Sequence, residues 1–250
     1  MKNTKVPKFT YVIPFRYKPD RVLALRRVVE LINGFKGAEV LIVEQDKHSK
    51  ISHLNLRANH MFIKSELPFN KSWALNYALK RVISPVIVCG DADFIMNPND
   101  LSNALNMMSD YDCVIPTSKN VELNQQESLS NINMILQIQR GGEKESMSDG
   151  ISIYKKQSLL DICGWNEDFI GYGKENEFQD MKIKTFLNYK RLEYTGYRLY
   201  TQKDKVDTKL LARNNKIMEH YKGANEEMLR NHMRNVAPKI GQKNKYSLFN

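Results

Sequence analysis

The 250-residue sequence is poor in cysteine and has no long hydrophobic run. Its three cysteines, Cys89, Cys113 and Cys163, are scattered without the spacing of a metal-binding cluster, which predicts free thiols. No segment approaches the roughly 20 apolar residues of a membrane helix, and the start, MKNTKVPKF, lacks the apolar core of a signal peptide. These absences predict a water-soluble, cytoplasmic protein without integral membrane association.

Acidic residues are scarce relative to basic ones. The chain has 28 Asp and Glu against 38 Lys and Arg, a formal net charge of +10, and the region from Thr201 onward carries eleven basic and five acidic residues. That region therefore holds 11 − 5 = +6 of the surplus. Such a surplus favours a polyanionic partner such as nucleic acid, an anionic glycan or a membrane surface. A lysine-rich solvated surface is the alternative.

The remaining composition is that of a folded α/β protein. Hydrophobic residues make up 42% and charged residues 26%, and the chain is long enough to bury a full core. Strand-like and helix-like segments alternate, which predicts a single domain with a mostly parallel central sheet. The predicted strands are 9–15, 39–43, 61–63, 86–89, 113–116 and 151–156. The predicted helices are 20–33 with Asp20 as its cap, 71–82, 101–108, 158–163 and 225–235. Residues 121–150 are predicted to be mostly loop, and 239–250 to be loose.

Two aspartates follow the third main strand. The apolar run over 86–89 ends in Gly90, Asp91, Ala92 and Asp93. Ligands of doubly wound sheets bind beyond the carboxyl ends of the strands, and carboxylate oxygens suit Mg²⁺ or Mn²⁺. The pair is therefore a candidate site for an ion that neutralises a diphosphate leaving group. The alternative is structural, because aspartates also cap helices.

Four stretches in series carry a resemblance. They are YVIPFR (11–16), PFNKSWALN (68–76), CGDADFIMNPND (89–100) and GWNEDFIGYGKENEF (164–178). In this order they resemble the GT-A glycosyltransferases, in particular the beta-1,4-galactosyltransferase branch and its bacterial family-two relatives. The resemblance implies a GT-A, Rossmann-like fold, a UDP-sugar donor and a divalent ion, Mn²⁺ or Mg²⁺.

The resemblance also implies which residues bind the donor. Each has a structural alternative: Arg16 as a surface charge, Asn70 as a helix cap and Asn76 as a polar surface residue. Asp91 and Asp93 match the metal–diphosphate motif, with Asp93 as the direct ligand. The implied donor-binding residues are Pro14, Phe15, Arg16, Glu44, Asp46, Asn70, Lys71, Asn76 and Asp91.

The segment 164–178 matches the acceptor side of the relatives. Trp165 and Tyr172 are implied to offer aromatic faces to a sugar, with Trp165 as a core residue the alternative. Relatives carry Glu-Asp where this chain has Glu175-Asn176, and an amide cannot accept a proton. Either Glu175 or Glu177 is then the general base, or the enzyme retains the anomeric configuration and needs none.

A second departure concerns the metal. Relatives place a metal-binding His near the position of Thr201, and this chain has none there. His220 or His232 could substitute, although a lone His is more often structural. Without a substitute the ion would depend on Asp93, the diphosphate and water.

Three functions follow as predictions. The first is transfer of a sugar to a hydroxyl of a hydroxymethylated or already glucosylated base in DNA, because the basic C-terminal region favours a polyanion. The second is transfer to a cell-surface or capsular glycan. The third is a non-enzymatic nucleic-acid-binding α/β protein. The GT-A domain is predicted to span 1–250, with a nucleotide-binding half (1–118), an acceptor-side half (119–205) and a basic helical extension (206–250).

Overall fold

A computed structural model describes residues 8–203 and 205–243. Within these residues nine strands form one sheet in the order β3-β2-β1-β4-β8-β6-β9-β5, and β7 pairs with β6. Strands β1, β2, β3, β4, β6 and β9 run in one direction, and β5, β7 and β8 run against them. The mostly parallel α/β sheet predicted from the sequence is confirmed.

The strand bounds agree with the apolar runs of the sequence. The first strand matches its predicted range, and β2, covered on both faces, is longer than predicted because Glu44, Gln45 and Asp46 are buried with the apolar residues before them. The strands are β1 (Phe9–Phe15), β2 (Ala38–Asp46), β3 (Asn59–Lys64), β4 (Val86–Gly90), β5 (Phe94–Met96), β6 (Cys113–Glu122), β7 (Gly142–Glu143), β8 (Ile151–Lys155) and β9 (Tyr189–Arg198).

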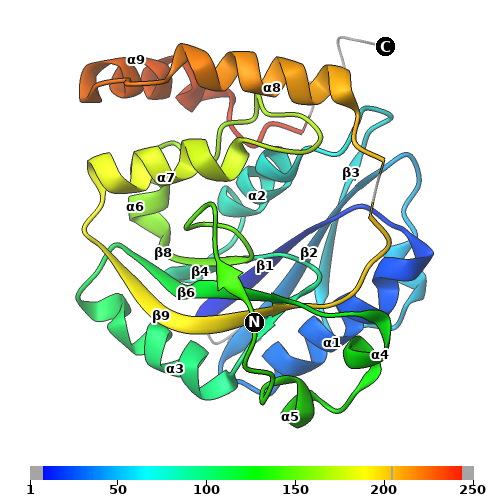
Figure 1. Ribbon diagram of the computed structural model, residues 1–250. Helices are drawn as coiled ribbons and strands as arrows, with labels where there is room; N and C mark the ends of the chain where they lie inside the picture. Colours follow the sequence, from blue (N-terminus) through cyan, green and yellow to red (C-terminus); the bar gives the residue numbers. More distant parts are fainter. Residues whose placement is uncertain (1–7, 204, 244–250) are drawn as a thin grey trace, which may run out of the picture.

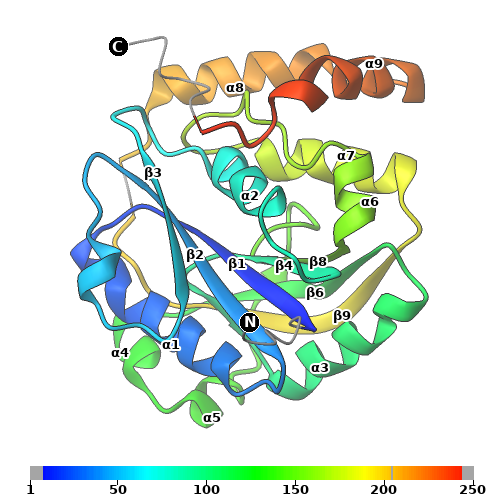
Figure 2. The ribbon, with the colours of Figure 1, turned by 180° about the vertical axis from the view of Figure 1, so that it is seen from behind.

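Helices cover both faces of the sheet (Figures 1 and 2). On one face lie α1 (Val22–Asn33), α3 (Pro98–Asn106), α4 (Gln125–Leu129) and α5 (Ile132–Ile135). On the other lie α2 (Lys71–Leu79), α6 (Lys156–Asp161) and α7 (Glu175–Phe186). The C-terminal helices α8 (Thr208–His220) and α9 (Glu226–Val236) form a further layer above α7 and α2, on the same side. No helix in the described ranges is long and apolar enough to cross a membrane.

Each sheet face has its own hydrophobic core because strand side chains alternate between faces. Tyr11 and Ile13 of β1 pack with Leu25 of α1, whereas Val12 packs with Trp73 of α2. A smaller apolar cluster around Phe178 joins α7 to the C-terminal helices. The helical region after residue 206 is thus packed onto the domain.

Several segments differ from the sequence prediction. Residues 121–150, predicted as mostly loop, include α4, α5 and β7, and α4 begins with a capping box between Asn124 and Glu127. Asp20 is not the cap of α1: it lies in a short 3₁₀ helix, Pro19–Arg21, and accepts a hydrogen bond from the Gln202 backbone at 2.9 Å. Strand β6 crosses the boundary predicted at 118/119, so both halves share one sheet.

The segment after α9 is packed as far as it is described. Gly241 is buried, and its backbone N–H donates to Glu167 Oε1 at 2.6 Å. Trp73 Nε1 donates to the Gln242 carbonyl at 2.8 Å. The prediction that 239–250 is loose is therefore wrong for 239–243, and its remainder lies outside the described residues.

A lysine that pairs with no carboxylate of residues 8–203 and 205–243 is buried between α7 and the end of α6. Lys182 of α7 is 1% exposed, and its ammonium donates to the carbonyls of Ile162 and Gly164, at the end of α6. The carbonyl dipoles at a helix C-terminus favour a positive charge. Burial nevertheless lowers the pKa of Lys182 to about 7, far below that of a lysine in water.

The pKa of Lys182 predicts a pH-dependent stability. Between about pH 7 and the ordinary lysine pKa of roughly 10.4, the unfolded chain binds one proton more than the folded chain, so this residue makes stability rise with pH. From pH 6.5 to 8.5 the wild type should gain about 2 kcal/mol relative to Lys182→Met. Urea unfolding of both proteins at the two pH values measures this difference. Equal changes in both would contradict it.

Candidate active site

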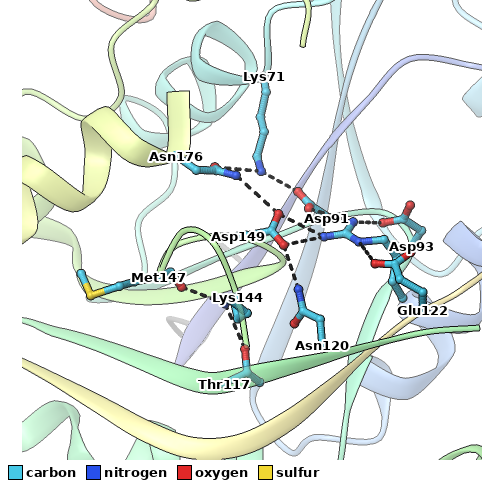
Figure 3. Close-up of polar contacts among 11 residues, drawn as sticks. Lys71, Asp91, Asp93, Thr117, Asn120, Glu122, Lys144, Met147, Asp149 and Asn176 are labelled. Atoms are coloured by element: carbon cyan, nitrogen blue, oxygen red, sulfur yellow. Dashed lines mark hydrogen bonds and ion pairs between the residues drawn. The ribbon is translucent and has the colours of Figure 1, made fainter. Parts of the chain in front are cut away.

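Charged side chains from three parts of the chain meet at one edge of the sheet (Figure 3). Asp91 and Asp93 follow β4 at its carboxyl end, and Asp149 lies two residues before the antiparallel β8 begins. Arg198 is the last residue of β9. Backbone hydrogen bonds from Asp91 to Gly150 (2.9 Å) and from Leu199 to Asp93 (2.7 Å) hold the three segments together.

Arg198 is the centre of this cluster. Its Nη1 donates to Asp93 Oδ1 at 2.9 Å and to Asp91 Oδ2 at 3.3 Å. Its Nη2 contacts both carboxylate oxygens of Asp149, at 3.1 and 3.0 Å, and its Nε lies 3.5 Å from Glu122 Oε1. A guanidinium has five donors in a planar fork, which allows one side chain to hold several carboxylates. The acidic side chains raise the pKa of Arg198 above its ordinary value despite burial.

A second cation approaches from α2. Lys71 Nζ lies 2.7 Å from Asp91 Oδ1 and 3.4 Å from Asn176 Oδ1. Burial works against the charge of Lys71, but the carboxylates of Asp91, Glu175 and Asp149 outweigh it and raise its pKa. Burial also favours protonation of Asp91, yet Lys71 and Arg198 keep its pKa below the ordinary value. The pKa of Asp93 is raised, by burial and by the neighbouring Asp91 charge, although Arg198 opposes this.

Helix α7 fixes the loop that carries Asp149. Asp180, on the buried side of α7, accepts hydrogen bonds from Ser146 Oγ (2.8 Å), the Met147 backbone (2.6 Å) and the backbone and hydroxyl of Ser148 (2.9 and 2.7 Å). A carboxylate with four donors rigidly fixes a short loop. The position of Asp149 therefore depends on Asp180.

The first turn of α7 separates the two candidate bases. Burial raises the pKa of Glu175. Its Oε2 is buried and has no hydrogen-bond partner among the described residues, and its carboxylate interacts with the charges of Lys71 and Asp91. Glu177 is half-exposed and pairs with Lys174 at 2.6 Å. The structure thus brings Glu175, and not Glu177, into the electrostatic field of the cluster. Asn176 lies between Lys71 and Asp149, 3.4 Å from each.

Asn70 and Asn76 both bond other parts of the protein through their side-chain amides. Asn70 caps α2 by accepting from Trp73 N at 2.9 Å, and its amide donates to the Glu167 carbonyl at 2.7 Å. Asn76 is fully buried and bonds the Trp165 backbone and Glu167 Oε1 through three hydrogen bonds of 2.7–2.8 Å. The structural alternative for Asn70 is thus confirmed, and Asn76 is a buried link between α2 and the 164–167 loop. Contact of either with a donor stays a prediction.

The predicted residues on β1 and β2 lie at the same edge of the sheet but are mostly internal. Glu44 is 0% exposed and accepts from Ser49 (2.9 Å), the Lys50 backbone (2.9 Å) and His60 (3.0 Å). These partners keep its pKa low although burial would raise it.

The four neighbouring residues complete this edge. Pro14 and Phe15 are buried in β1, and Asp46 accepts from the Lys47 backbone at 2.7 Å. Half-buried Arg16 donates to the Leu67 carbonyl at 2.9 Å. The four predicted residues on β1 and β2, which are Pro14, Phe15, Glu44 and Asp46, are thus all buried. Nucleotide contact by any of these residues stays a prediction.

The two predicted acceptor aromatics differ in exposure. Trp165 is 1% exposed and packs in the second core, so it has no free face for a sugar, and its prediction as an acceptor-stacking residue is wrong. Tyr172 is 73% exposed. Its loop is anchored to α8, because Asn214 donates to the carbonyls of Ile170, Tyr172 and Gly173 at 3.0–3.2 Å. Tyr172 stays a candidate for acceptor contact.

Neither candidate histidine belongs to the cluster. His232 of α9 bonds Tyr221 at 2.9 Å and packs on Phe178, and His220 packs on Tyr221. The basic residue that reaches the carboxylates is Arg198, three residues before Thr201, and sequence reasoning missed it because it searched that stretch for an imidazole. Asp149 was missed as well, although an Asp-Gly pair before a strand marks a chain reversal at the sheet edge.

The donor atoms partly fit a hard divalent ion. Asp91, Asp93 and Asp149 offer the carboxylate oxygens that Mg²⁺ and Mn²⁺ prefer. In 8–203 and 205–243, however, no group of three or more His, Cys, Asp or Glu is arranged to hold an ion. Arg198 already bonds the oxygens that an ion would use. The residues therefore supply only part of a coordination shell, and an ion there would take further ligands from another molecule.

This geometry is accompanied by a family match. The model of the family "Glycosyl transferase family 2" matches residues 20–164, more than half of the 250 residues. The chain belongs to glycosyl transferase family 2. The chain is thus a glycosyltransferase, and the prediction of a non-enzymatic nucleic-acid-binding protein is wrong. By sequence, this glycosyltransferase has no significant match among curated proteins.

Solved structures share its fold. One is a mutant of Drosophila beta-1,4-galactosyltransferase 7 with manganese, UDP-Gal and xylobiose, at 14% identity and a TM-score of 0.54, covering 83% of this chain and 80% of that one. Another is S. aureus TarS 1–349 with UDP-GlcNAc, at 16% identity and a TM-score of 0.56, covering 79% of this chain and 60% of that one. A third is Mycobacterium tuberculosis glucosyl-3-phosphoglycerate synthase with Mn²⁺, UDP and glucosyl-3-phosphoglycerate. It has 12% identity and a TM-score of 0.54, and the match covers 85% of this chain and 77% of that one. The GT-A fold predicted from the four stretches is confirmed.

Proposed function

We propose that this family 2 member transfers a sugar from a UDP-sugar, with the help of Mn²⁺ or Mg²⁺, to a hydroxyl acceptor. The observation that carries the proposal is the cluster at the carboxyl edge of the sheet, where Asp91 and Asp93 meet Lys71 and Arg198. The diphosphate of a UDP-sugar is the leaving group of the transfer. It needs positive charge around its phosphates to neutralise the negative charge that develops as its bond to the sugar breaks. The structures of the galactosyltransferase, of TarS and of the phosphoglycerate synthase hold UDP, UDP-sugars or Mn²⁺.

The chain's own residues have separate parts in this proposal. Asp93 and Asp91 would hold the ion, which would supply Lewis-acid stabilisation of the departing diphosphate. Lys71 and Arg198 offer donors to phosphate oxygens. Arg16, Asp46 and Asn70 stay candidates for contact with the uridine side of the donor.

Glu175 is the proposed proton acceptor. Its buried, partnerless Oε2 and its raised pKa suit a base that takes the proton of an attacking hydroxyl. Exposed Tyr172 lies on the loop before α7 and is the candidate for contact with the acceptor. Glu177 is the alternative base, and a retaining reaction would need neither.

The first experiment tests the donor. The protein is incubated with UDP-sugars and GDP-sugars in Mn²⁺, Mg²⁺ or EDTA, and released nucleotide and thermal stability are measured. We expect release from a UDP-sugar with the ion, and a melting temperature that rises with UDP and Mn²⁺ together. Unchanged melting and no release from any donor would contradict the proposed function. Full release of the nucleotide in EDTA would show that the reaction does not need the ion.

For the acceptor we propose DNA that carries a hydroxymethylated or already glucosylated base. The support is the charge of the region from Thr201 onward, where exposed basic side chains lie on both C-terminal helices. Duplex DNA is bound by such residues through its phosphates, in a salt-dependent way. These side chains are Lys209, Arg213 and Lys216 on α8, and Arg230 and Arg234 on α9.

DNA binding should therefore weaken steeply with salt. If Lys209 and Lys216 contact phosphates, Lys209→Gln/Lys216→Gln should lower the slope of log affinity against log salt by about 1.8, since each phosphate contact contributes roughly 0.9. Fluorescence anisotropy with a labelled duplex between about 50 and 200 mM salt measures this slope.

The matched control removes two charges from the opposite face. Lys36 follows α1, and Arg57 lies beside the end of α1, where its carbonyl accepts from Asn33 at 2.8 Å. The Lys36→Gln/Arg57→Gln protein should keep the wild-type slope. Equal slopes for all three proteins, or no duplex binding at low salt, would contradict the DNA proposal. Transfer to a capsular glycan but not to modified DNA would support the glycan instead.

A further inference from the structure

Arg198 has the position that a metal ion would take. Its guanidinium lies within hydrogen-bonding distance of Asp91, Asp93 and Asp149 at once, at 2.9–3.3 Å. Figure 3 shows the three carboxylates turned toward a common point. Arg198 is thus bound to the same oxygens that the proposed function assigns to Mn²⁺ or Mg²⁺.

The backbone around Arg198 is shaped to hold it there. Arg198 pairs with Phe94 across β9 and β5, and its guanidinium carbon lies 5.4 Å from the centre of the Phe94 ring. A Cβ at Gly196 would come within 1.9 Å of that ring, and one at Gly150 within 2.5 Å. Both glycines therefore let the ring pack beneath the arginine, where the π-face attracts the cation. Packing against Phe94 thus adds to the ion pairs that hold Arg198 at the carboxylates.

We propose that Arg198 is an internal counter-ion that competes with the metal and that couples metal binding to donor binding. This inference rests on the proposed function. Two cations cannot share the same carboxylate oxygens without repulsion, so the ion enters only when Arg198 moves away from them. The diphosphate of the donor supplies a replacement anion, and the fork of a guanidinium matches phosphate oxygens as well as it matches carboxylates.

The charges favour joint entry of ion and donor. Asp91, Asp93 and Asp149 contribute −3, and Lys71 and Arg198 contribute +2, so these five side chains sum to −1. A divalent ion without donor would change the sum to +1. With the two negative charges of a diphosphate the sum returns to −1. The net charge of the site is therefore the same, −1, with neither ligand bound and with both bound.

The test measures Mn²⁺ affinity without catalysis. Mn²⁺ is titrated into the wild type and into Arg198→Gln, each without nucleotide and with UDP. Electron paramagnetic resonance measures the free Mn²⁺ at each step. We expect wild type to bind Mn²⁺ weakly without nucleotide and at least tenfold more tightly with UDP. Arg198→Gln should bind Mn²⁺ at least tenfold more tightly than wild type when no nucleotide is present, and UDP should improve its affinity less.

Two further variants locate the ion and the charge. Arg198→Lys keeps the positive charge and should bind Mn²⁺ without nucleotide nearly as weakly as wild type. If the measured ion binds at this site, adding Asp93→Asn to Arg198→Gln should abolish the gain in Mn²⁺ affinity. Circular dichroism confirms that each variant is folded.

The inference is overturned if Arg198→Gln binds Mn²⁺ no more tightly than wild type in the absence of nucleotide, or if neither binds Mn²⁺. It is also overturned if Arg198→Gln is unfolded and Arg198→Lys binds Mn²⁺ much more tightly than wild type. The proposed function fails separately, through the absence of donor hydrolysis and of UDP binding. In that case a tighter Mn²⁺ site in Arg198→Gln would support the competition between Arg198 and the ion, and the coupling to a donor would fail.

Discussion

Replacing Glu175 by Gln should lower the rate of sugar transfer by about 10²- to 10⁴-fold, the usual contribution of a general base. The amide has the shape of the carboxylate but cannot accept a proton. Because Glu175 is next to the cluster without bonding it, the variant should keep the affinity for UDP and Mn²⁺ within about threefold. Steady-state transfer rates and UDP titrations measure the two quantities.

Glu177 supplies a matched control in the same turn of α7. The same change there, Glu177→Gln, removes one negative charge and one ion pair with Lys174, at a half-exposed position. Surface ion pairs contribute little, so transfer should change less than about twofold. The reverse pattern, with loss of transfer only in Glu177→Gln, would assign the base to Glu177. Normal transfer by both variants would favour a retaining reaction.

The pH dependence gives an independent reading of Glu175. A base must be unprotonated to act, and burial raises the pKa of Glu175. Transfer by the wild type should therefore fall on the acid side at a pH above the ordinary glutamate range near 4.3. The residual activity of Glu175→Gln should lack this decline. A wild-type profile that stays flat down to pH 4 would contradict the assignment.

The sequence predicted the fold where apolar periodicity was strong and missed it where charge masked the pattern. Strand β1 is surrounded by turn residues and matched its range. Helix α7 was not predicted, because Gln179, Asp180 and Lys182 are all buried polar residues on its inner side. Asp180 and Lys182 have hydrogen-bond partners outside the helix, as Asp180 has in the 146–148 loop. A single sequence does not show those partners.

Long strand β9 and helix α8 were missed for different reasons. β9 carries Lys190, Arg191 and Glu193 among its apolar residues, which hides the alternation of a strand. α8 did have a start signal: Asp207 accepts from the backbone N–H groups of Lys209 (3.0 Å) and Leu210 (3.1 Å). That signal was overlooked because the surrounding lysines were considered for their charge and not for helix formation.

For the candidate site, the sequence showed which kinds of side chain take part better than it showed which of them contact one another. Asp91, Asp93 and Lys71 were selected and do meet. Arg198 and Asp149 complete the cluster from the ends of β9 and β8, and only the antiparallel insertion of β8 between β4 and β6 brings them there. Trp165 was predicted to offer an aromatic face to a sugar, but in the structure its side chain is buried in the core. Residue type indicates possible chemistry, whereas topology decides which residues share a site.

Replacing Asp93 by Asn should lower sugar transfer by roughly three orders of magnitude and weaken binding of UDP with Mn²⁺. The reason is that the amide removes a charged oxygen ligand, and ion stabilisation of a leaving group is worth several kcal/mol, with about 1.4 kcal/mol for each tenfold. Binding of UDP in EDTA should change much less, because Lys71 and Arg198 remain. Isothermal titration with and without Mn²⁺ and a transfer assay measure these effects.

The control for Asp93 is Asp110→Asn, which makes the same chemical change at an exposed position after α3. It should transfer sugar at the wild-type rate. The stability of Asp93→Asn separates a local from a global effect: burial raises the pKa of Asp93, so its charge costs desolvation in the folded state, and the neutral amide should not unfold the protein. Wild-type transfer and Mn²⁺-dependent UDP binding by folded Asp93→Asn would show that the two aspartates after β4 are structural, and that the positive charge for the diphosphate comes from Arg198 and Lys71.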